Sequence, residues 1–277
     1  MVGPKAKRAA AKFLHERFSA SERRSARVLG LNRSTLFYCP RPSRDGPLEE
    51  RIKELASKHR RFGLPRIHFL LRKEGAVKAK SRSERVYRRL GLQLKKRGRK
   101  KLLPVVRVPF EKAAQPNEIW SFDFVHDYAA TERKLKVLTI VDDCSKKSPG
   151  LLVDYSIPSG AMIAFFESLP TLPSRFRCDN GPEMASREFM EWAQDRGIEI
   201  EYIEPGKPIQ NAYIESFNSR FRDECLNEEV FIDLEDAKKK IERWRREYNQ
   251  SRPHSALGMK TPNEYEEEFN KNLTRRD

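Results

Sequence analysis

The spacing of apolar residues changes character at Ile119, and this change limits the fold more than any other feature of the chain. Before Ile119, apolar residues recur every three or four positions, which is typical of helices. After it come segments rich in β-branched and aromatic residues, which are typical of strands. The expected strands are 119–125, 135–141, 150–155, 176–178 and 198–203, with helices at 160–169 and 186–196. Three successive strands followed by alternating helices and strands predict an α/β fold with a mixed sheet flanked by helices.

Residues 1–45 predict a helix-turn-helix-like segment. A helix at 21–29 ends at Gly30, and Asn32 is a suitable N-cap for a second helix at 33–38. At the beginning of that second helix, Arg33 and Thr35 would reach base edges or phosphates in the major groove. The pattern alone fits an ordinary pair of packed helices equally well.

Residues 46–94 predict a second helical module that binds DNA. Leu48, Ile52 and Leu55 share one helical face. A later helix turns its apolar residues inward and a row of arginines outward, including Arg85 and Arg88, which we expect to contact DNA.

The positive charge of the chain belongs to its first part. The net charge is +16, with +23 in residues 1–101 and −7 in residues 102–277. A field of this size attracts polyanions and gives phosphate affinity that weakens as salt rises, so double-stranded DNA is the expected partner. The linker at 95–111 begins with Lys95, Lys96 and Arg97, which would lie along phosphates, although a solvated tether is the alternative.

Composition also indicates where the protein works. The four cysteines lack the C-x-x-C spacing of a zinc site and do not suggest a disulfide framework. The basic N-terminus lacks the apolar stretch of a signal peptide, and no run approaches the length of a membrane span. We therefore expect a cytoplasmic protein that makes no membrane contact.

Three carboxylates in the second part, at 112–270, predict one divalent-metal site. Asp123 falls inside an expected strand, where aspartate is rare unless something requires it. Asp179 follows a short strand, although Asp-Asn-Gly is also a common turn. Glu215 lies on an expected helix. Two metal ions about 4 Å apart activate a nucleophile and stabilise the leaving oxygen in phosphodiester chemistry.

The helix of Glu215 has a polar stripe beside an apolar one. Asn211, Glu215, Asn218 and Arg222 share the polar face, which favours a ligand role for Glu215 over that of a solvent-exposed acid. We expect Arg222 to pair with a phosphate. Lys207, Gln210 and Asn211 precede this helix, where they would grip a DNA end.

Other polar residues receive structural roles. Asp142 and Asp143 end an expected strand, and their turn position predicts capping. Ala237, Ile241, Trp244 and Tyr248 form the core face of a late helix. No Ser-His-Asp or tyrosine-nucleophile arrangement competes with metal catalysis.

Several motifs together carry a resemblance to a known family. They are Trp120-x-x-Asp123, Asp179-Asn-Gly-Pro-Glu183, the stretch from Pro205 to Asn218, Arg222-Asp-Glu-Cys-Leu-Asn227, and Tyr248-Asn-x-x-Arg-Pro-His-Ser-x-Leu-Gly258. With them the chain resembles the insertion-sequence-three family of bacterial transposases, specifically the second-frame (OrfB) protein, over nearly its whole length. Two departures stand out: the stretch from Ser159 to Asp179 is shorter than is typical of the family, and Met184 replaces an aromatic residue.

The resemblance implies an RNase H-like core shared with retroviral integrases, preceded by an all-α DNA-binding region. It implies that Asp123, Asp179 and Glu215 hold two Mg2+ ions, for which Mn2+ would substitute, and that a 3′-hydroxyl is freed or transferred at the ends of an insertion sequence. It also implies a homo-oligomer on DNA and a first-frame (OrfA) partner, made by frameshifting as a fusion.

Two other classes of function stay open at this point. A non-catalytic DNA-binding protein, either a regulator or an inactive transposase relic, would use only the basic part of the chain. An RNase H-type nuclease would cut RNA–DNA hybrids whatever the sequence of their ends. The intact set of three acids favours the transposase.

Overall fold

The computed structural model describes residues 3–39, 45–94, 112–203 and 212–274. The chain divides into two compact units, residues 1–47 and residues 48–277. The expected basic linker from Lys95 to Glu111, and the expected DNA-end residues Lys207, Gln210 and Asn211, lie outside the described residues. The domain boundaries drawn from the sequence stay a prediction.

The first unit contains three helices, α1 (Pro4–Phe18), α2 (Glu22–Leu29) and α3 (Arg33–Leu36). Ser21 and Asn32 cap α2 and α3, because their side chains accept hydrogen bonds from the backbone N–H groups of Arg24 and Ser34. Gly30 ends α2 in the left-handed conformation at φ 57°. The expected helix, glycine turn and helix are present, and α1, which sequence periodicity did not reveal, precedes them.

Three helices open the second unit: α4 (Gly46–Lys58), α5 (Leu64–Lys73) and α6 (Lys80–Arg89). The apolar face predicted for α4 is buried, and it packs with the apolar residues of α5 and α6. Their common core consists of Leu48, Ile52, Leu55, Phe62, Ile67, Leu71, Val77, Val86 and Tyr87. These helices therefore have a hydrophobic core of their own, separate from the sheet.

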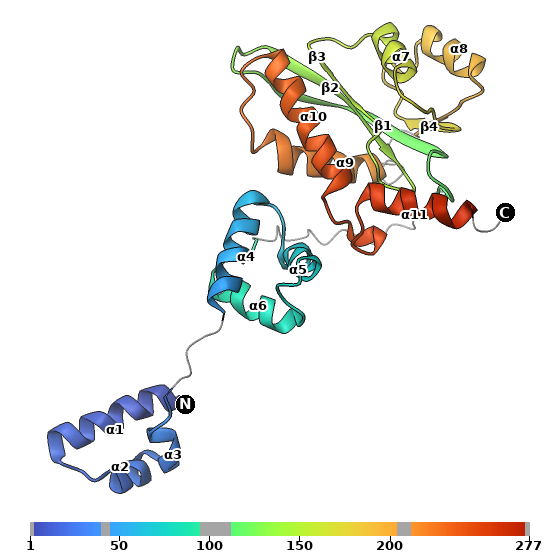
Figure 1. Ribbon diagram of the computed structural model, residues 1–277. Coiled ribbons are helices and arrows are strands. Elements are labelled where there is room, and N and C mark those ends of the chain that lie inside the picture. The colour runs from blue at the N-terminus through green and yellow to red at the C-terminus, as the bar shows by residue number, and fades with distance from the viewer. Residues whose placement is uncertain (1–2, 40–44, 95–111, 204–211, 275–277) are drawn as a thin grey trace. The chain divides into compact units, whose positions relative to one another are not determined.

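A five-stranded mixed sheet forms the centre of the second unit (Figure 1). Its strands are β1 (Ile119–Tyr128), β2 (Lys134–Asp142), β3 (Leu151–Asp154), β4 (Arg175–Cys178) and β5 (Glu199–Tyr202), in the order β3-β2-β1-β4-β5. β1, β2 and β3 are antiparallel neighbours, whereas β4 runs parallel to β1 and β5 parallel to β4. The predicted mixed sheet flanked by helices is confirmed.

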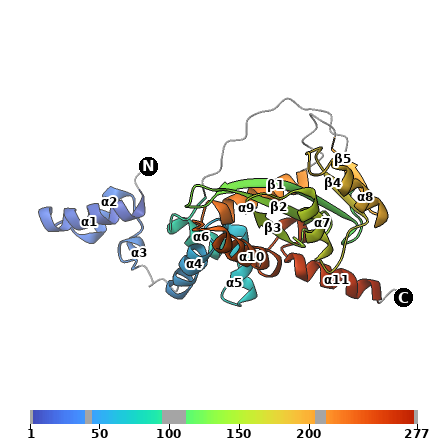
Figure 2. The ribbon, with the colours of Figure 1, turned by 90° about the horizontal axis from the view of Figure 1, so that it is seen from above.

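Helices cover both faces of this sheet (Figures 1 and 2). One face packs on α7 (Ser159–Glu167) and α8 (Arg187–Asp195). The other packs on α9 (Ala212–Phe221), its π-helical continuation η2 (Arg222–Leu226), and α10 (Leu234–Gln250). Side chains alternate along a strand, so Trp120 and Phe122 of β1 join the first core and Val125 joins the second.

The second core fixes the helix that carries Glu215. Ile214, Phe217 and Phe221 of α9 are buried, and Phe217 contacts Tyr248 of α10 edge-to-face with 5.0 Å between ring centroids. The predicted core face of α10 is confirmed, because Ala237, Ile241, Trp244 and Tyr248 are all buried. After α10, a short 3-10 turn η3 (Ser255–Leu257) and α11 (Pro262–Thr274) complete the unit.

No helix among the described residues has the length and apolar character needed to cross a membrane. All four cysteines lie in the described residues and are free, so the expectation that they form no disulfide framework is confirmed.

Candidate active site

Strand register aligns Asp123 with Asp179. Ser121 of β1 pairs with Arg177 of the parallel strand β4. Asp123 lies two residues further along β1, on the same face of the sheet as Ser121, and Asp179 lies two residues beyond Arg177, directly after the end of β4. The parallel pairing therefore brings together two carboxylates that are far apart in the sequence.

Hydrogen bonds orient Asp123 within β1. Its Oδ1 accepts from the backbone N–H of Phe124 at 2.7 Å, and its Oδ2 accepts from Nδ2 of Asn218 at 2.9 Å. Thr139, directly opposite on β2, donates its hydroxyl to the Asp123 carbonyl at 2.9 Å. The carboxylate is thus tied both to the sheet and to α9.

Asn218 also locates Glu215 relative to the strands. The two residues are three positions apart on α9, which places them on one helical face. Because Asn218 reaches Asp123, this face of α9 is turned toward the strand carboxylates. Glu215 itself is exposed.

Asp179 begins a tight turn after β4. Its Oδ1 accepts from the backbone N–H of Gly181 at 3.0 Å. A Cβ at Gly181 would stand 3.1 Å from that same oxygen, so glycine allows the backbone to approach the carboxylate. The turn interpretation of Asp-Asn-Gly and the site interpretation therefore both apply here.

Burial and the charges of the other two acids both act on the Asp123 carboxyl. Burial raises the pKa of the Asp123 carboxyl, and the negative charges of Asp179 and Glu215 add to this effect. The hydrogen bonds from Phe124 and Asn218 oppose it, because they stabilise the ionised form. Repulsion among carboxylates in one region is relieved by a bound cation.

The donor chemistry fits a hard cation, although the carboxylates do not close into a complete ligand set. Among the described residues, no three His, Cys, Asp or Glu side chains form a group that could hold a metal ion. Beside Asp123, however, the buried Oδ1 of Asn218 has no hydrogen-bond partner in the part of the chain that the structure describes. An unpaired buried acceptor and three carboxylates suit a divalent cation with oxygen ligands.

A lysine that sequence patterns did not single out lies close by. Lys136 of β2 forms an ion pair with Glu183, four residues after Asp179. Its Nζ stands 3.9 Å from the centre of the Phe124 ring. The Lys136 charge is therefore paired with an acid, and the two residues are too distant in sequence for a local pattern to reveal the pair.

The described DNA-contact candidates lie on helices of both units. Arg33 and Thr35 lie on α3 in the first unit, where Arg33 is 3.9 Å from Glu22. Arg85 and Arg88 are exposed on α6, and Arg88 pairs with Glu84 at 2.6 Å. Arg222 of η2 donates to the carbonyl of His126 at 3.4 Å.

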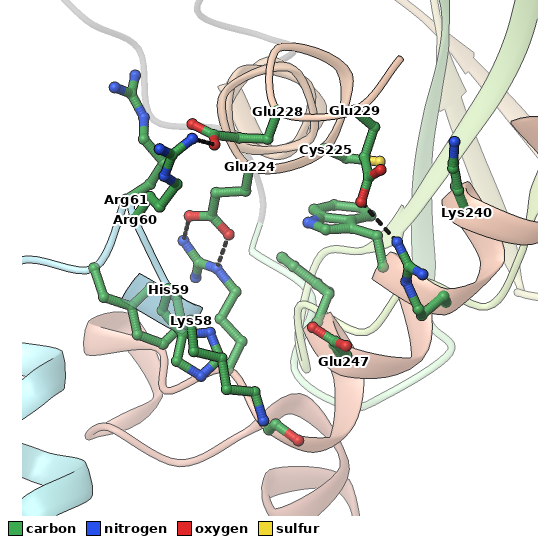
Figure 3. A pocket seen from close by; sticks show the side chains of 16 residues that line it. Lys58, His59, Arg60, Arg61, Glu224, Cys225, Glu228, Glu229, Lys240 and Glu247 are labelled. Carbon is green, nitrogen blue, oxygen red and sulfur yellow. Dashed lines mark hydrogen bonds and ion pairs between the residues drawn. The ribbon is translucent and has the colours of Figure 1, made fainter. Parts of the chain in front are cut away.

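A cavity of about 410 Å³ in the second unit has a different character (Figure 3). Three of the four acids that line it are paired with arginine: Glu224 with Arg252 at 2.6 Å, Glu228 with Arg60 at 3.1 Å and Glu229 with Arg243 at 2.6 Å. Glu247 is the fourth. None of Asp123, Asp179 and Glu215 lines the cavity. Because arginine neutralises most of its carboxylates, the acidic region at the sheet is the better candidate for a metal site.

Family models divide the chain in agreement with these elements. Integrase core domain models match residues 113–208 and residues 196–262, and an HTH-like domain model matches residues 43–100. The HTH-like match thus falls on α4–α6. The helix-turn-helix assignment of residues 1–45 stays a prediction.

Sequence identity to relatives over most of the chain identifies the family. A 31.7 kDa protein of insertion element IS407 from Burkholderia multivorans is 41% identical over 257 residues, which are 91% of this chain and 92% of that protein. A 39.2 kDa protein of insertion element IS476 from Xanthomonas euvesicatoria is 41% identical over 268 residues, 95% of this chain and 78% of that protein. The putative transposase InsK of element IS150 from Escherichia coli is 24% identical over 86% of this chain and 91% of its own.

The chain belongs to the insertion-sequence-three family of transposases. The family models and the strand order identify the core of this transposase as RNase H-like. The catalytic core domain of HTLV-2 integrase is also similar, at 22% identity and a TM-score of 0.43, covering 56% of this chain and 99% of that one.

Proposed function

We propose that this transposase cuts and rejoins DNA at the ends of its element by metal-dependent polynucleotidyl transfer, with Asp123, Asp179 and Glu215 as the catalytic carboxylates. The observation that supports the proposal is that Asp123 on β1 is hydrogen-bonded to Asn218 of α9 and lies beside the strand that ends just before Asp179. Burial raises the pKa of Asp123, and the charges of Asp179 and Glu215 add to this effect.

These three residues, with Oδ1 of Asn218 beside them, would hold two Mg2+ ions, and Mn2+ would substitute. Such ions make an oxygen nucleophile at neutral pH and stabilise the charge on the leaving oxygen. Asp123 contributes the most rigid carboxylate, because hydrogen bonds fix both of its oxygens. Asp179 and Glu215 are exposed, so DNA can approach from their side.

The basic first part of the chain supplies affinity for DNA. We propose that Arg85 and Arg88 on α6, Arg33 and Thr35 on α3, and Arg222 on η2 contact element-end or target DNA. Lys95, Lys96, Arg97, Lys207, Gln210 and Asn211 keep the same proposed role from the sequence. The working form would be a homo-oligomer that pairs two ends in the cytoplasm, acting with or fused to a first-frame partner.

Cleavage assays test this function directly. Purified full-length transposase and DNA carrying the element ends should give nicked or joined products with Mg2+ or Mn2+ and none with EDTA. Asp179→Asn should abolish product while DNA affinity in a gel-shift assay stays within about twofold, because the change leaves the basic region intact. Asp195→Asn, an exposed acid at the end of α8, is the matched control and should retain activity.

The competing functions give different results in the same assays. Products that persist in EDTA, or in Asp179→Asn, would exclude the proposed mechanism. Tight DNA binding without any product would favour the non-catalytic relic, and cleavage of RNA–DNA hybrids regardless of end sequence would favour a general nuclease.

A further inference from the structure

The turn after β2 is a buried polar structure with no part in the chemistry proposed above. Asp142, Asp143 and Ser145 are all almost fully buried. Asp142 caps the turn as the sequence predicts, because it accepts hydrogen bonds from the backbone N–H of Cys144 and from the hydroxyl of Ser145. Asp143 does not cap it, and its carboxylate points to other strands.

Asp143 joins the two strands that carry the catalytic aspartates. Its Oδ1 accepts from the hydroxyl of Ser121 on β1 at 2.7 Å, and its Oδ2 accepts from Nη1 of Arg177 on β4 at 2.5 Å. The Asp143 and Arg177 side chains are fully buried, and Arg177 also donates to Glu201 of β5. One carboxylate therefore ties β1 and β4 together inside the core.

The same turn reaches the helix of the third acid. Nζ of Lys146 stands 3.6 Å from the centre of the Tyr213 ring on α9, which is a cation–π contact. The Lys146 amine also donates to the carbonyl of Asp143. Asp143 and Lys146 thus form one connected unit that touches β1, β4 and α9.

The three contacted residues have the same relation to the three acids. Ser121, Arg177 and Tyr213 each precede a catalytic carboxylate by two positions. In a strand, two positions bring the side chain back to the same face. Fixing Ser121 and Arg177 therefore fixes the positions of Asp123 and Asp179 along the strand direction. On a helix, two positions turn the side chain to nearly the opposite side, so the grip on Tyr213 sets the rotation of α9.

We propose that Asp143 and Lys146 are positioning residues that align Asp123, Asp179 and Glu215 for metal binding. This inference rests on the proposed function, and it adds the residues that hold the three carboxylates in alignment.

A buried ion pair is suited to this task because it penalises misalignment. A parallel strand shifted by two residues keeps the same side chains on the same faces, so hydrophobic burial alone discriminates weakly against it. The same shift would separate Asp143 from Arg177, which would keep its pair with Glu201, and would leave the Asp143 carboxylate buried without its charge partner, which is strongly unfavourable. The pair therefore selects one register between β1 and β4.

Measuring Mn2+ binding to the full-length protein tests the proposal. Electron paramagnetic resonance monitors the binding, because the signal of the free ion is lost when Mn2+ binds. Asp143→Asn should raise the Mn2+ dissociation constant at least about tenfold, as loss of support for metal ligands typically does. Lys146→Met should raise it too, and Lys146→Arg should restore it, because arginine keeps a cation over the Tyr213 ring.

The control separates positioning from general stability. Asn249→Ala removes a buried amide of α10 that bonds both the N–H and the carbonyl of Ser148 and so makes no hydrogen bond to β1, β4 or α9. The midpoint of unfolding should fall in Asn249→Ala, as in Asp143→Asn, but the Mn2+ affinity of Asn249→Ala should stay at the wild-type value. If Asp143→Asn does not fold, the comparison of Lys146→Met with Lys146→Arg tests the positioning role.

Failures of the two proposals are distinguishable. If wild-type protein binds Mn2+ and Asp123→Asn abolishes binding, yet folded Asp143→Asn and Lys146→Met bind with wild-type affinity, the positioning role is overturned alone. If the wild type binds no Mn2+ with element-end DNA present, the metal mechanism fails and the positioning role fails with it.

Discussion

Asn218 has two different tasks at its two amide atoms. Its Nδ2 donates to the Asp123 carboxylate at 2.9 Å, whereas its buried Oδ1 has no partner among the described residues. An unsatisfied buried acceptor is unfavourable for stability, and such groups in native proteins call for a functional reason. The proposed cation beside Asp123 would supply that reason, because the free oxygen could coordinate it.

Asn218→Ala should therefore reduce catalysis more than DNA binding. We expect the rate of strand cleavage to fall about 10–100-fold, since the orienting partner of a metal ligand is lost. Single-turnover assays at saturating DNA measure this rate, and gel-shift titration measures affinity. Asn227→Ala, at an exposed position after η2, should leave both unchanged. Equal rates in the two variants would contradict the assigned role.

His254 makes stability depend on pH in a defined direction. Burial lowers its pKa to about 2, and the neighbouring charges of Arg252, Arg220 and Arg66 act in the same direction. A histidine that stays neutral when folded and ionises when unfolded stabilises the protein fully above its unfolded pKa, and this contribution is lost as the pH falls below about 6.5.

Between pH 7.5 and pH 5, wild-type protein should lose about 2 kcal/mol more stability than His254→Gln, which has no proton to gain. Urea unfolding at a series of pH values measures the difference. The two stabilities should differ by a constant amount above pH 7.5. Parallel pH profiles over the whole range would rule out this origin of acid sensitivity.

Among the elements, η2 and the end of α10 are joined by a buried ion pair. Arg252 forms two hydrogen bonds with Glu224, at 2.6 and 2.7 Å, and its guanidinium lies 5.5 Å from the centre of the Tyr248 ring. Only 4% of the Arg252 side chain is exposed. This pair connects the continuation of the Glu215 helix to the helix that packs against it.

Arg252→Ala should destabilise the second unit by about 3–5 kcal/mol, because it leaves Glu224 buried without its charge partner. The comparison is Arg187→Ala, whose exposed pair with Glu191 on α8 should cost at most about 0.5 kcal/mol. Chemical denaturation followed by circular dichroism gives both values. A loss of stability below about 1 kcal/mol for Arg252→Ala would show that water solvates the Glu224 carboxylate in place of the arginine.

The sequence predicts those elements that have a distinctive apolar pattern. A regular apolar stripe indicates the core faces of α4 and α10, and richness in β-branched and aromatic residues indicates the strands. By contrast, Ala11 is the only residue of α1 among the buried ones, so α1 left no such stripe. The three acids stood out by their local contexts. The pairing of Asp143 with Arg177 did not, because it depends on β1 and β4 becoming neighbours through the fold.

At the level of the full chain, the basic and acidic parts divide the work of binding and chemistry. Residues 1–101 hold +23 and residues 102–277 hold −7, so we expect phosphate affinity to come from the first part. On the proposed mechanism, the acidic core would need bound cations to receive the same polyanion. DNA binding and catalysis should therefore respond to different ions.

Salt titrations can separate the two. Arg85→Gln should weaken DNA binding and reduce the slope of log affinity against log salt by about 1, as loss of one phosphate contact does. Arg187→Gln on the acidic core should leave the slope unchanged. Fluorescence anisotropy with labelled duplex measures both, and identical slopes for the Arg85 variant and wild type would remove this residue from the DNA interface.

The parallel pairing of β1 with β4 has a practical outcome for protein engineering. Hydrogen bonds between these strands, and not the length of chain joining them, decide where Asp179 stands relative to Asp123. The exposed segment at Pro170–Thr171, between α7 and β4, can therefore accommodate added residues at small entropic cost. A protease site or a small fluorescent domain inserted there would mark the transposase for tracking while its chemistry continues undisturbed.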